Sequence, residues 1–271
     1  MALTDPDPDP RSTAPDKADR FDLSVVTPAR NECGNLTPLV AEIQDAFAGS
    51  ALRIQIVVVD DGSTDGTAKE LVTLLAEHPN LRVLKHELPL GQSLSLHAGF
   101  AAASALLVAT LDADLQNDPA DLPRMVRRLQ NERADLVQGD RTANRRDHFA
   151  RRSASAVGRW ARRVIVGDRV RDTGCATRVM RRTFAVRLPL DRPGMHRFIP
   201  ACVAGLGGRV IETPVNHRPR HAGKTKYGTG LIKRGLPGLR DCFVVRGLIR
   251  RERARTPADV PGASQLKPAQ L

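Results

Sequence analysis

Thr110-Leu111-Asp112-Ala113-Asp114-Leu115-Gln116 ends an apolar run in two acids and an amide. The run Ala105–Leu111 can lie buried as a strand, whereas carboxylates are costly to bury without partners, so the acids should reach an edge of the fold. If the chain stays extended, the side-chain period of two places Asp112, Asp114 and Gln116 on one side. Three oxygen ligands there suit a hard divalent cation. Solvated loop residues in front of a helix are the open alternative.

Short apolar runs alternate with amphipathic segments on both sides of this stretch. The expected strands are Leu23–Thr27, Ile54–Val59, Leu81–Leu84, Leu106–Leu111 and Leu136–Gln138, and the expected helices are Leu36–Phe47, Thr67–Ala76, Leu94–Ala103 and Leu122–Leu129. This alternation predicts an α/β fold, with a mostly parallel sheet and helices on both faces. Ligands bind beyond the carboxyl ends of the strands in such sheets, which makes that edge the expected functional one.

Two further polar clusters follow expected strands, Pro28–Glu32 after the first and Asp60–Asp65 after the second. The doubled acid Asp60-Asp61 exceeds what one helix cap needs, and a carboxylate there could accept hydrogen bonds from a base or a ribose. Glu32 can equally stabilise a helix N-terminus through the helix dipole. The sequence therefore indicates a nucleotide pocket beside the cation site, with helix caps as the alternative.

The composition favours an anionic partner. The 271 residues, 41% of them hydrophobic, suffice for a large core. A net charge of +12 predicts attraction to nucleic acid, an acidic membrane surface or a phosphorylated substrate. Aromatic residues make up only 3%, which disfavours nucleic acid bound by base stacking, and we expect no nucleic-acid partner. The four cysteines lack disulfide or metal-ligand spacing, so we expect free thiols in a reducing compartment.

The two ends of the chain carry no apolar periodicity. Residues 1–20 are expected to form a disordered acidic tail because Asp and Pro alternate there, and residues 256–271 a second disordered tail. The chain shows no signal-peptide pattern and no apolar run near the ~20 residues of a spanning helix. We therefore expect a cytoplasmic protein, peripheral on the cytosolic face of a membrane.

Two basic segments lie in the second half of the chain. Residues 217–227 combine charge with glycine, and a loop with Arg220 and Lys226 can close over a pyrophosphate, although a solvated linker fits the same pattern. Residues 228–255 mix apolar and basic side chains, as in an interfacial helix or a helix pair broken near Gly235-Leu236-Pro237-Gly238. A helix that packs against the core is the alternative.

Seven motifs together resemble the family 2 glycosyltransferases, in the branch of dolichol-phosphate mannosyltransferases and polyprenyl-phosphate glucosyltransferases. The motifs are Pro28-x-x-Asn31-Glu32, Asp60-Asp61-Gly62-Ser63-x-Asp65, Gly91-Gln92 with Ala98-Gly99-Phe100, Asp112-Ala113-Asp114-Leu115-Gln116 with Asp118-Pro119, Gly139-x-Arg141, Asp172-x-Gly174-Cys175, and Arg220-x-x-Gly223-x-Thr225-Lys226-Tyr227. The resemblance covers Phe21 to Arg251 and implies a GT-A type nucleotide-diphospho-sugar transferase with its catalytic domain at 21–227. Arg30, where the family commonly has Tyr, and Leu88-Pro89, where it commonly has Arg-Asn, depart from the pattern.

The resemblance implies a role for each group of motif residues. The nucleotide-sugar-binding residues would be Pro28, Glu32, Asp60, Asp61, Asp112, Ala113, Arg220 and Lys226. The ligands of Mg²⁺ or Mn²⁺ would be Asp112, Asp114 and Gln116, and the residues that cradle the acceptor phosphate would be Arg141, Arg151 and Ser155. The expected catalytic residues are Asp112, Asp114 and Arg141.

The implied reaction is inverting transfer of a hexose from a UDP-glucose or GDP-mannose type of donor to a polyprenyl phosphate. Cations stabilise the negative charge of the leaving nucleoside diphosphate, and a lipid phosphate is already anionic at about pH 7, so no dedicated base is required. Two alternatives stay open, namely a soluble or protein acceptor, and a non-catalytic basic protein that binds membrane or nucleic acid. The chain would reach lipid through its interfacial segment, an anionic membrane surface or a small integral membrane partner.

Overall fold

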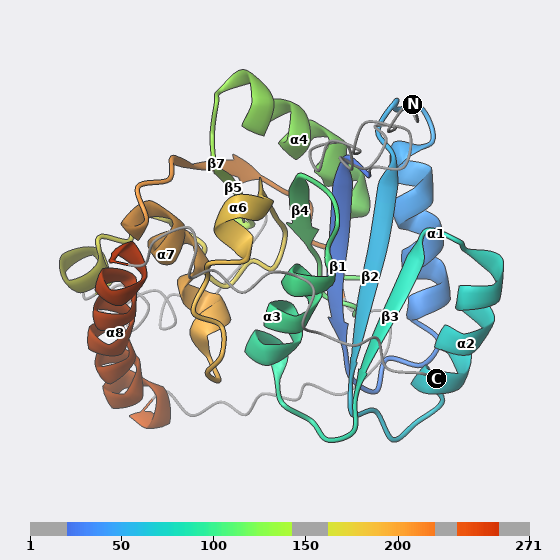
Figure 1. Cartoon of the computed structure of the whole chain (residues 1–271), viewed down its shortest axis with the longest axis horizontal. Coiled ribbons are helices and arrows are strands. Elements are labelled where there is room, and N and C mark those ends of the chain that lie inside the picture. The colour runs from blue at the N-terminus through green and yellow to red at the C-terminus, as the bar shows by residue number, and fades with distance from the viewer. Residues whose placement is uncertain (1–20, 143–161, 220–231, 255–271) are drawn as a thin grey trace, which may run out of the picture.

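A computed structural model describes residues 21–142, 162–219 and 232–254, with only the helical backbone given for 232–239. Seven strands form one sheet in the order β3-β2-β1-β4-β6-β5-β7 (Figure 1). The strands are β1 (Leu23–Ala29), β2 (Ile54–Asp61), β3 (Leu81–His86), β4 (Leu107–Thr110), β5 (Leu136–Asp140), β6 (Arg178–Arg181) and β7 (Val210–Pro214). The helices used below are α1 (Leu36–Phe47), α2 (Thr67–Glu77), α3 (Gln92–Ala102), α4 (Leu122–Asn131), α6 (Arg182–Ala185), η4 (Met195–Phe198), α7 (Ile199–Gly205) and α8 (Ile232–Arg253).

The strands are mostly parallel, as the sequence predicts. β1 pairs in parallel with β2 and β4, β2 with β3, and β5 with β7. Among the described strands, only β6 runs antiparallel, between β4 and β5. Its first residue, Arg178, therefore lies opposite Thr110 of β4 and Gln138 of β5. This reversal brings the start of β6 to the edge where the parallel strands end.

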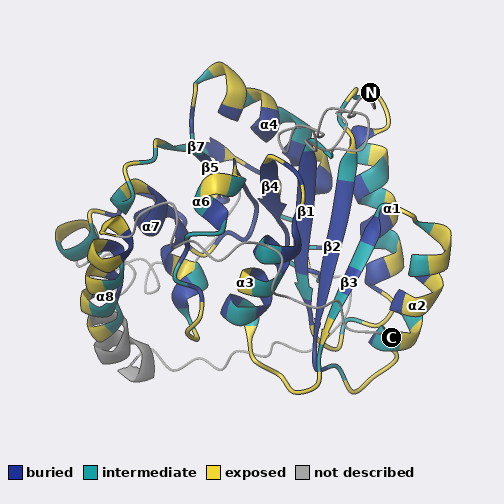
Figure 2. Cartoon of the chain, in the orientation of Figure 1, coloured by how far each residue is buried: buried dark blue, intermediate teal, exposed yellow. Residues whose placement is uncertain are grey.

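Successive strand residues face two separate cores. Val25, Ile56 and Ala109 pack with α1, α2 and α4 on one face, whereas Val26 and Val108 pack with α3, α7 and α8 on the other. Figure 2 shows the central strands dark blue between helices that are exposed on their outer sides. A strand buried on both faces must be apolar at every position, which explains the continuous apolar runs of the sequence.

Element bounds agree with the expected ones to within a few residues. α1 has the expected limits, because its buried side chains recur at helical spacing. β4 is shorter than expected, since Leu106 is 62% exposed and Thr110 is the last residue of the strand. α3 begins at Gln92, two residues before the expected Leu94, which places Gln92 in the first turn of the helix.

α8 is one continuous helix through residues 235–238, so the predicted break there is wrong. Gly and Pro disfavour a helix interior, Pro by about 3 kcal/mol, but the tertiary context can override such a preference. Cys242, Val245 and Ile249 are buried against the α7 side of the core, as the core-packing alternative requires. Within the described residues, no helix combines the length and the hydropathy that crossing a bilayer demands. The two expected tails lie outside the described residues.

Candidate active site

Asp112, Asp114 and Gln116 follow β4 at the carboxyl edge of the sheet. All three side chains are half-buried, and the residues that alternate with them are buried. Burial therefore alternates from Asp112 to Gln116. The expected extended conformation is not found, because strand pairing stops at Thr110 and the chain turns at Ala113 and Asp114. Leu115 has a φ of 60°, in the left-handed region that non-glycine residues rarely adopt, and its side chain is buried in the core. The turn is thus held by packing and presents its acids to the edge.

Asp112 is held by a neighbouring helix and is electrostatically strained. Gln92 Nε2 donates to Asp112 Oδ1 at 2.9 Å. Burial and the nearby carboxylate of Asp114 raise the pKa of Asp112 to about 6, against the opposing influence of Arg178 and Arg141. A divalent cation between two carboxylates relieves such repulsion, so this donor set fits Mg²⁺ or Mn²⁺.

The third expected ligand, Gln116, is tied to the segment after β7. Its Nε2 donates to the carbonyl of Arg218 at 3.4 Å, and the Arg218 amide donates to the Gln116 carbonyl at 2.8 Å. Arg218 also forms ion pairs with Glu42 at 2.7 Å and Asp118 at 2.8 Å. In the part of the chain that the structure describes, no group of three or more His, Cys, Asp and Glu side chains could hold a metal. The expected cation site, made of two carboxylates and an amide, stays a prediction.

Arg141, at the end of β5, forms a buried bidentate ion pair with Asp172. Nε lies 2.7 Å from Oδ2, and Nη2 lies 3.1 Å from Oδ1. Burial lowers the pKa of Arg141, but Asp172 outweighs this effect and the net pKa is raised. A Cβ atom at Gly174 would lie 3.3 Å from Nη2, so glycine leaves room for the guanidinium. Arg141 is therefore fixed in place, and any phosphate there shares the guanidinium with Asp172.

Arg178 is a second cation at this edge, and no pattern in the sequence singles it out as a site residue. It is 2% exposed, and it donates through Nε to Gln138 Oε1 at 2.8 Å and through Nη2 to the Thr173 carbonyl at 3.3 Å. Among the described residues, no carboxylate forms an ion pair with Arg178, and burial lowers its pKa against the influence of Cys175 and Asp112. Its charge therefore acts on Asp112 from within the sheet.

Asp60 and Asp61, adjacent at the end of β2, have different environments. Asp60 Oδ1 accepts a hydrogen bond from the Ser63 amide at 3.0 Å. Asp60 Oδ2 is buried without a hydrogen-bond partner among the described residues. A buried acceptor without a donor is costly, and a ligand N–H at this position would satisfy it.

Asp61 instead holds the loop between β3 and α3. Its carboxylate accepts hydrogen bonds from the amides of Leu90 and Gly91, both at 2.8 Å, and lies 3.0 Å from His86 Nδ1. Burial raises the pKa of Asp61, but these hydrogen bonds more than offset it, so the pKa is lowered. A direct nucleotide contact by Asp61 stays a prediction.

Hydrogen bonds join the clusters after β1 and β2, so the two clusters lie side by side at the carboxyl edge of the sheet. The Asn31 amide donates to Ser63 Oγ at 2.9 Å, and Asn31 Oδ1 accepts from the Thr64 amide at 2.8 Å. Glu32 accepts a hydrogen bond from Asn35 Nδ2 at 2.8 Å, and its charge contributes to the raised pKa of Asp112. Pro28 is half-buried at the end of β1.

Several expected site residues contribute differently or lie elsewhere. The Ala113 side chain is buried in the core, so only its backbone can meet a ligand. The residues that lie outside the described part of the chain are Arg151, Ser155, Arg220 and Lys226. The four cysteines, Cys33, Cys175, Cys202 and Cys242, are free thiols as expected.

The contacts that hold the start of α3 in place are not predicted by the sequence. Ser93 Oγ lies 2.9 Å from His196 Nδ1 and accepts a hydrogen bond from the His196 amide at 3.2 Å. Burial, together with the charges of Arg178 and Arg197, lowers the pKa of His196 to about 3, so the imidazole is neutral. These contacts hold the first turn of α3, which carries Gln92. Gln92 itself was visible in a sequence motif, whereas a contact across 103 positions leaves no local signal.

Comparisons with known proteins identify a matching family model and curated relatives with two kinds of name. The model of glycosyl transferase family 2 matches residues 24–188. A dodecaprenyl-phosphate galacturonate synthase of Rhizobium johnstonii is 35% identical over 79% of this chain and 64% of its own length. An undecaprenyl-phosphate 4-deoxy-4-formamido-L-arabinose transferase of Edwardsiella ictaluri is 36% identical over 76% of this chain and 63% of its own length. The chain thus spans less than two thirds of these curated relatives.

Solved structures share the architecture at lower identity. A glucosyl-3-phosphoglycerate synthase of Mycobacterium tuberculosis, in complex with Mn²⁺, UDP-glucose and phosphoglyceric acid, has a TM-score of 0.61 and 20% identity over 83% of this chain and 79% of its own. Its complex with Mg²⁺ and UDP has a TM-score of 0.59 and 21% identity over the same share of each chain. At this level of identity the likeness concerns the fold, and the expected GT-A type of fold is confirmed.

Proposed function

The chain belongs to glycosyl transferase family 2, and from this membership we propose that it transfers a sugar from a nucleotide-diphospho-sugar to a polyprenyl phosphate. The observation that carries the proposal is the pair Asp112 and Asp114 at the carboxyl edge of the sheet. The positive charges of Arg141 and Arg178 lie near enough to lower the pKa of Asp112. The relatives at 35% and 36% identity are named for transfer to dodecaprenyl and undecaprenyl phosphate, which favours a polyprenyl acceptor here.

We assign donor binding to the clusters after β1 and β2. Asp60 Oδ2 would accept a hydrogen bond from the base or the ribose, since it lacks a partner among the described residues. Glu32 and Pro28 would line the same pocket, and Asp61 would keep the adjoining loop in place through Leu90 and Gly91. Arg220 and Lys226 remain the proposed contacts of the diphosphate.

Departure of the nucleoside diphosphate places negative charge next to Asp112 and Asp114. The two carboxylates and Gln116 would hold Mg²⁺ or Mn²⁺, which supplies positive charge at the leaving oxygens. Gln92 orients Asp112 through the 2.9 Å hydrogen bond. Arg178 favours the ionised form of Asp112, the form that binds a cation.

Arg141 is the proposed contact of the acceptor phosphate, together with Arg151 and Ser155. The Asp172 pair keeps the Arg141 guanidinium in a fixed orientation, which suits a planar contact with phosphate oxygens. The phosphate oxygen of the acceptor is anionic, so none of these residues has to remove a proton. In-line attack would invert the anomeric centre. A polyprenyl acceptor would place the protein on the cytosolic face of a membrane.

A matrix of donors and acceptors tests this proposal. UDP-glucose, GDP-mannose and UDP-galacturonate would each be incubated with the full chain, Mg²⁺ or Mn²⁺, and either undecaprenyl phosphate in detergent or a soluble phosphorylated acceptor. We expect a lipid-linked sugar, detected by mass spectrometry, with at least one donor. Product on the soluble acceptor alone would refute the polyprenyl acceptor. Absence of turnover across the matrix, with folded protein, would favour the non-catalytic alternative.

A further inference from the structure

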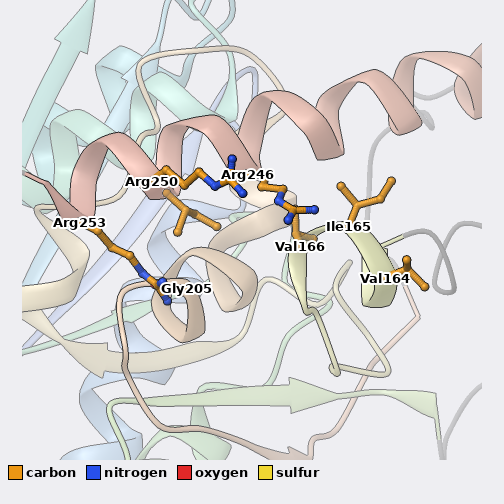
Figure 3. Close-up of a pocket in the computed structure, with 8 residues that line it drawn as sticks. Val164, Ile165, Val166, Gly205, Arg246, Arg250 and Arg253 are labelled. Atoms are coloured by element: carbon orange, nitrogen blue, oxygen red, sulfur yellow. The ribbon is translucent and has the colours of Figure 1, made fainter.

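A pocket of about 290 Å³ lies beside the second half of α8. Its lining residues are Val164, Ile165, Val166, Gly205, Arg246, Ile249, Arg250 and Arg253 (Figure 3). They come from the helical turn at 162–166, the end of α7 and one side of α8. Figure 1 shows α8 at the flank of the molecule, beyond α7. The lining includes no residue of the candidate active site.

The pocket concentrates positive charge. Arg246, Arg250 and Arg253 recur at spacings of four and three, so they share one side of α8. Arg253 donates through Nε to the Gly205 carbonyl, which turns it across the end of α7. Among the described residues, no carboxylate forms an ion pair with Arg246 or Arg250, and the Glu252 carboxylate is buried and paired with Arg187 at 3.6 Å. An anion in the pocket would relieve the repulsion between these arginines.

The surroundings of the arginines are apolar. Three of the lining residues, Ile249, Ile165 and Val166, also pack into the hydrophobic core cluster. Val164 is 60% exposed at its edge, and Phe243 is 63% exposed on α8, three residues before Arg246. Exposed apolar side chains next to arginines are typical of surfaces that rest at a membrane interface, where the apolar groups enter the acyl boundary. A soluble anion would leave the exposed side chains of Val164 and Phe243 without an apolar partner.

We propose that this pocket binds the phosphate headgroup of an anionic phospholipid. Arginine suits this ligand because its planar guanidinium donates two parallel hydrogen bonds to phosphate oxygens. Phe243 and Val164 would enter the lipid layer beside the headgroup. The lipid site is separate from the acceptor site proposed at Arg141, and it does not depend on the transfer reaction. A nucleic acid would be bound through its phosphates by basic side chains, and the exposed apolar side chains of Val164 and Phe243 would have no partner there.

Vesicle sedimentation with the full chain tests the lipid site. One set of vesicles contains phosphatidylcholine alone, and the other equal parts of phosphatidylcholine and phosphatidylglycerol. The test variant is Arg246→Gln with Arg250→Gln. The matched control is Arg127→Gln with Arg192→Gln, which removes the same charge from two exposed arginines elsewhere. A third variant, Phe243→Ser, removes the apolar contact without a change in charge.

We expect binding to the anionic vesicles only, weakened at least about tenfold in the test variant and clearly less in the control. Phe243→Ser should weaken binding several-fold. Equal weakening in test and control variants would mean general charge attraction and would overturn the site. So would a wild-type chain that binds inorganic phosphate at these arginines without sedimenting with the anionic vesicles. Transfer to an acceptor in detergent should be unchanged in the test variant, which separates this site from the proposed reaction.

Discussion

Asp112 is the residue on which the contacts of the carboxyl edge converge. Gln92 donates to it, Asp114 repels it, and Arg178 and Arg141 attract it. Burial dominates, so its pKa is raised to about 6 from the ordinary value of 3.8. An acid with a raised pKa binds more protons in the folded state than in the unfolded state. Asp112 therefore stabilises the metal-free protein at low pH, and this contribution is lost as the pH rises from about 4 to about 6.

The first prediction concerns this pH dependence. Asp112→Asn should remove the contribution of Asp112 to that loss, on the order of 2 kcal/mol, because the substituted side chain does not titrate. Chemical denaturation of metal-free protein at a series of pH values measures the effect. Asp45→Asn, an exposed change on α1, is the control and should retain the wild-type profile. An unaltered profile in Asp112→Asn would assign the titration to another group.

The second prediction concerns Arg178. Arg178→Gln leaves the oxygens of Gln138 and Thr173 without their donors inside the sheet, so we expect a loss of about 1–3 kcal/mol in unfolding free energy. Removal of the charge should also move the pH window of Asp112 upward. Arg178→Lys keeps the charge and should restore the position of the window but not the full stability. A window that stays in place in Arg178→Gln would show that Arg178 does not act on Asp112.

At the scale of elements, β2 ends in two acids that the structure places in different environments. Asp61→Asn replaces one acceptor oxygen with an N–H₂ group that faces the amides of Leu90 and Gly91. We expect a destabilisation of about 2 kcal/mol together with a less ordered loop before α3. Asp60→Asn should leave stability nearly unchanged and weaken UDP or GDP binding, measured by calorimetry. If Asp61→Asn weakened nucleotide binding without loss of stability, the assignment of the two acids would be reversed.

The elements also show what sequence patterns can and cannot predict. α1 follows from apolar residues at helical spacing, and the strands through β5 follow from short apolar runs that the sheet buries on both faces. The antiparallel direction of β6 has no such signal, since four residues pair in either direction with the same pattern. The sequence therefore does not predict Arg178 as a site residue, although the nearby Asp172 and Cys175 belong to one of the seven motifs. Packing of α8 on α7 overrides the local signals of Gly and Pro that suggested a break.

At the scale of the whole molecule, the predicted α/β fold and the family are confirmed, whereas the roles of the site residues stay predictions. Three polar clusters after three strands predict one shared edge, and the structure joins them through Asn31, Ser63, Glu32 and Asp112. Contacts that cross the fold, such as Ser93 with His196, depend on the final packing of distant segments. The expected lid residues and part of the acceptor cradle lie outside the described residues and remain predictions.

The molecule has two basic regions on different elements, the edge with Arg141 and Arg178 and the flank with Arg246 and Arg250. We propose that the first meets the reacting phosphates and the second an anionic lipid surface. Raised ionic strength should therefore weaken vesicle binding through the exposed flank more than nucleotide binding at the buried edge, because exposed charges are screened more strongly. Vesicle sedimentation and calorimetry over a salt series measure the two responses. Equal salt sensitivity would argue against this division.

The most direct test of the account is formation of a lipid-linked sugar by the wild-type chain and by Asp112→Asn. With the productive donor, undecaprenyl phosphate and Mg²⁺ or Mn²⁺, the wild type and the Asp45→Asn control should form equal amounts of product. Asp112→Asn should lose about 100-fold or more of the rate, since it removes charge at the point where the diphosphate departs. Wild-type turnover in folded Asp112→Asn would contradict the central claim that this carboxylate organises the transfer.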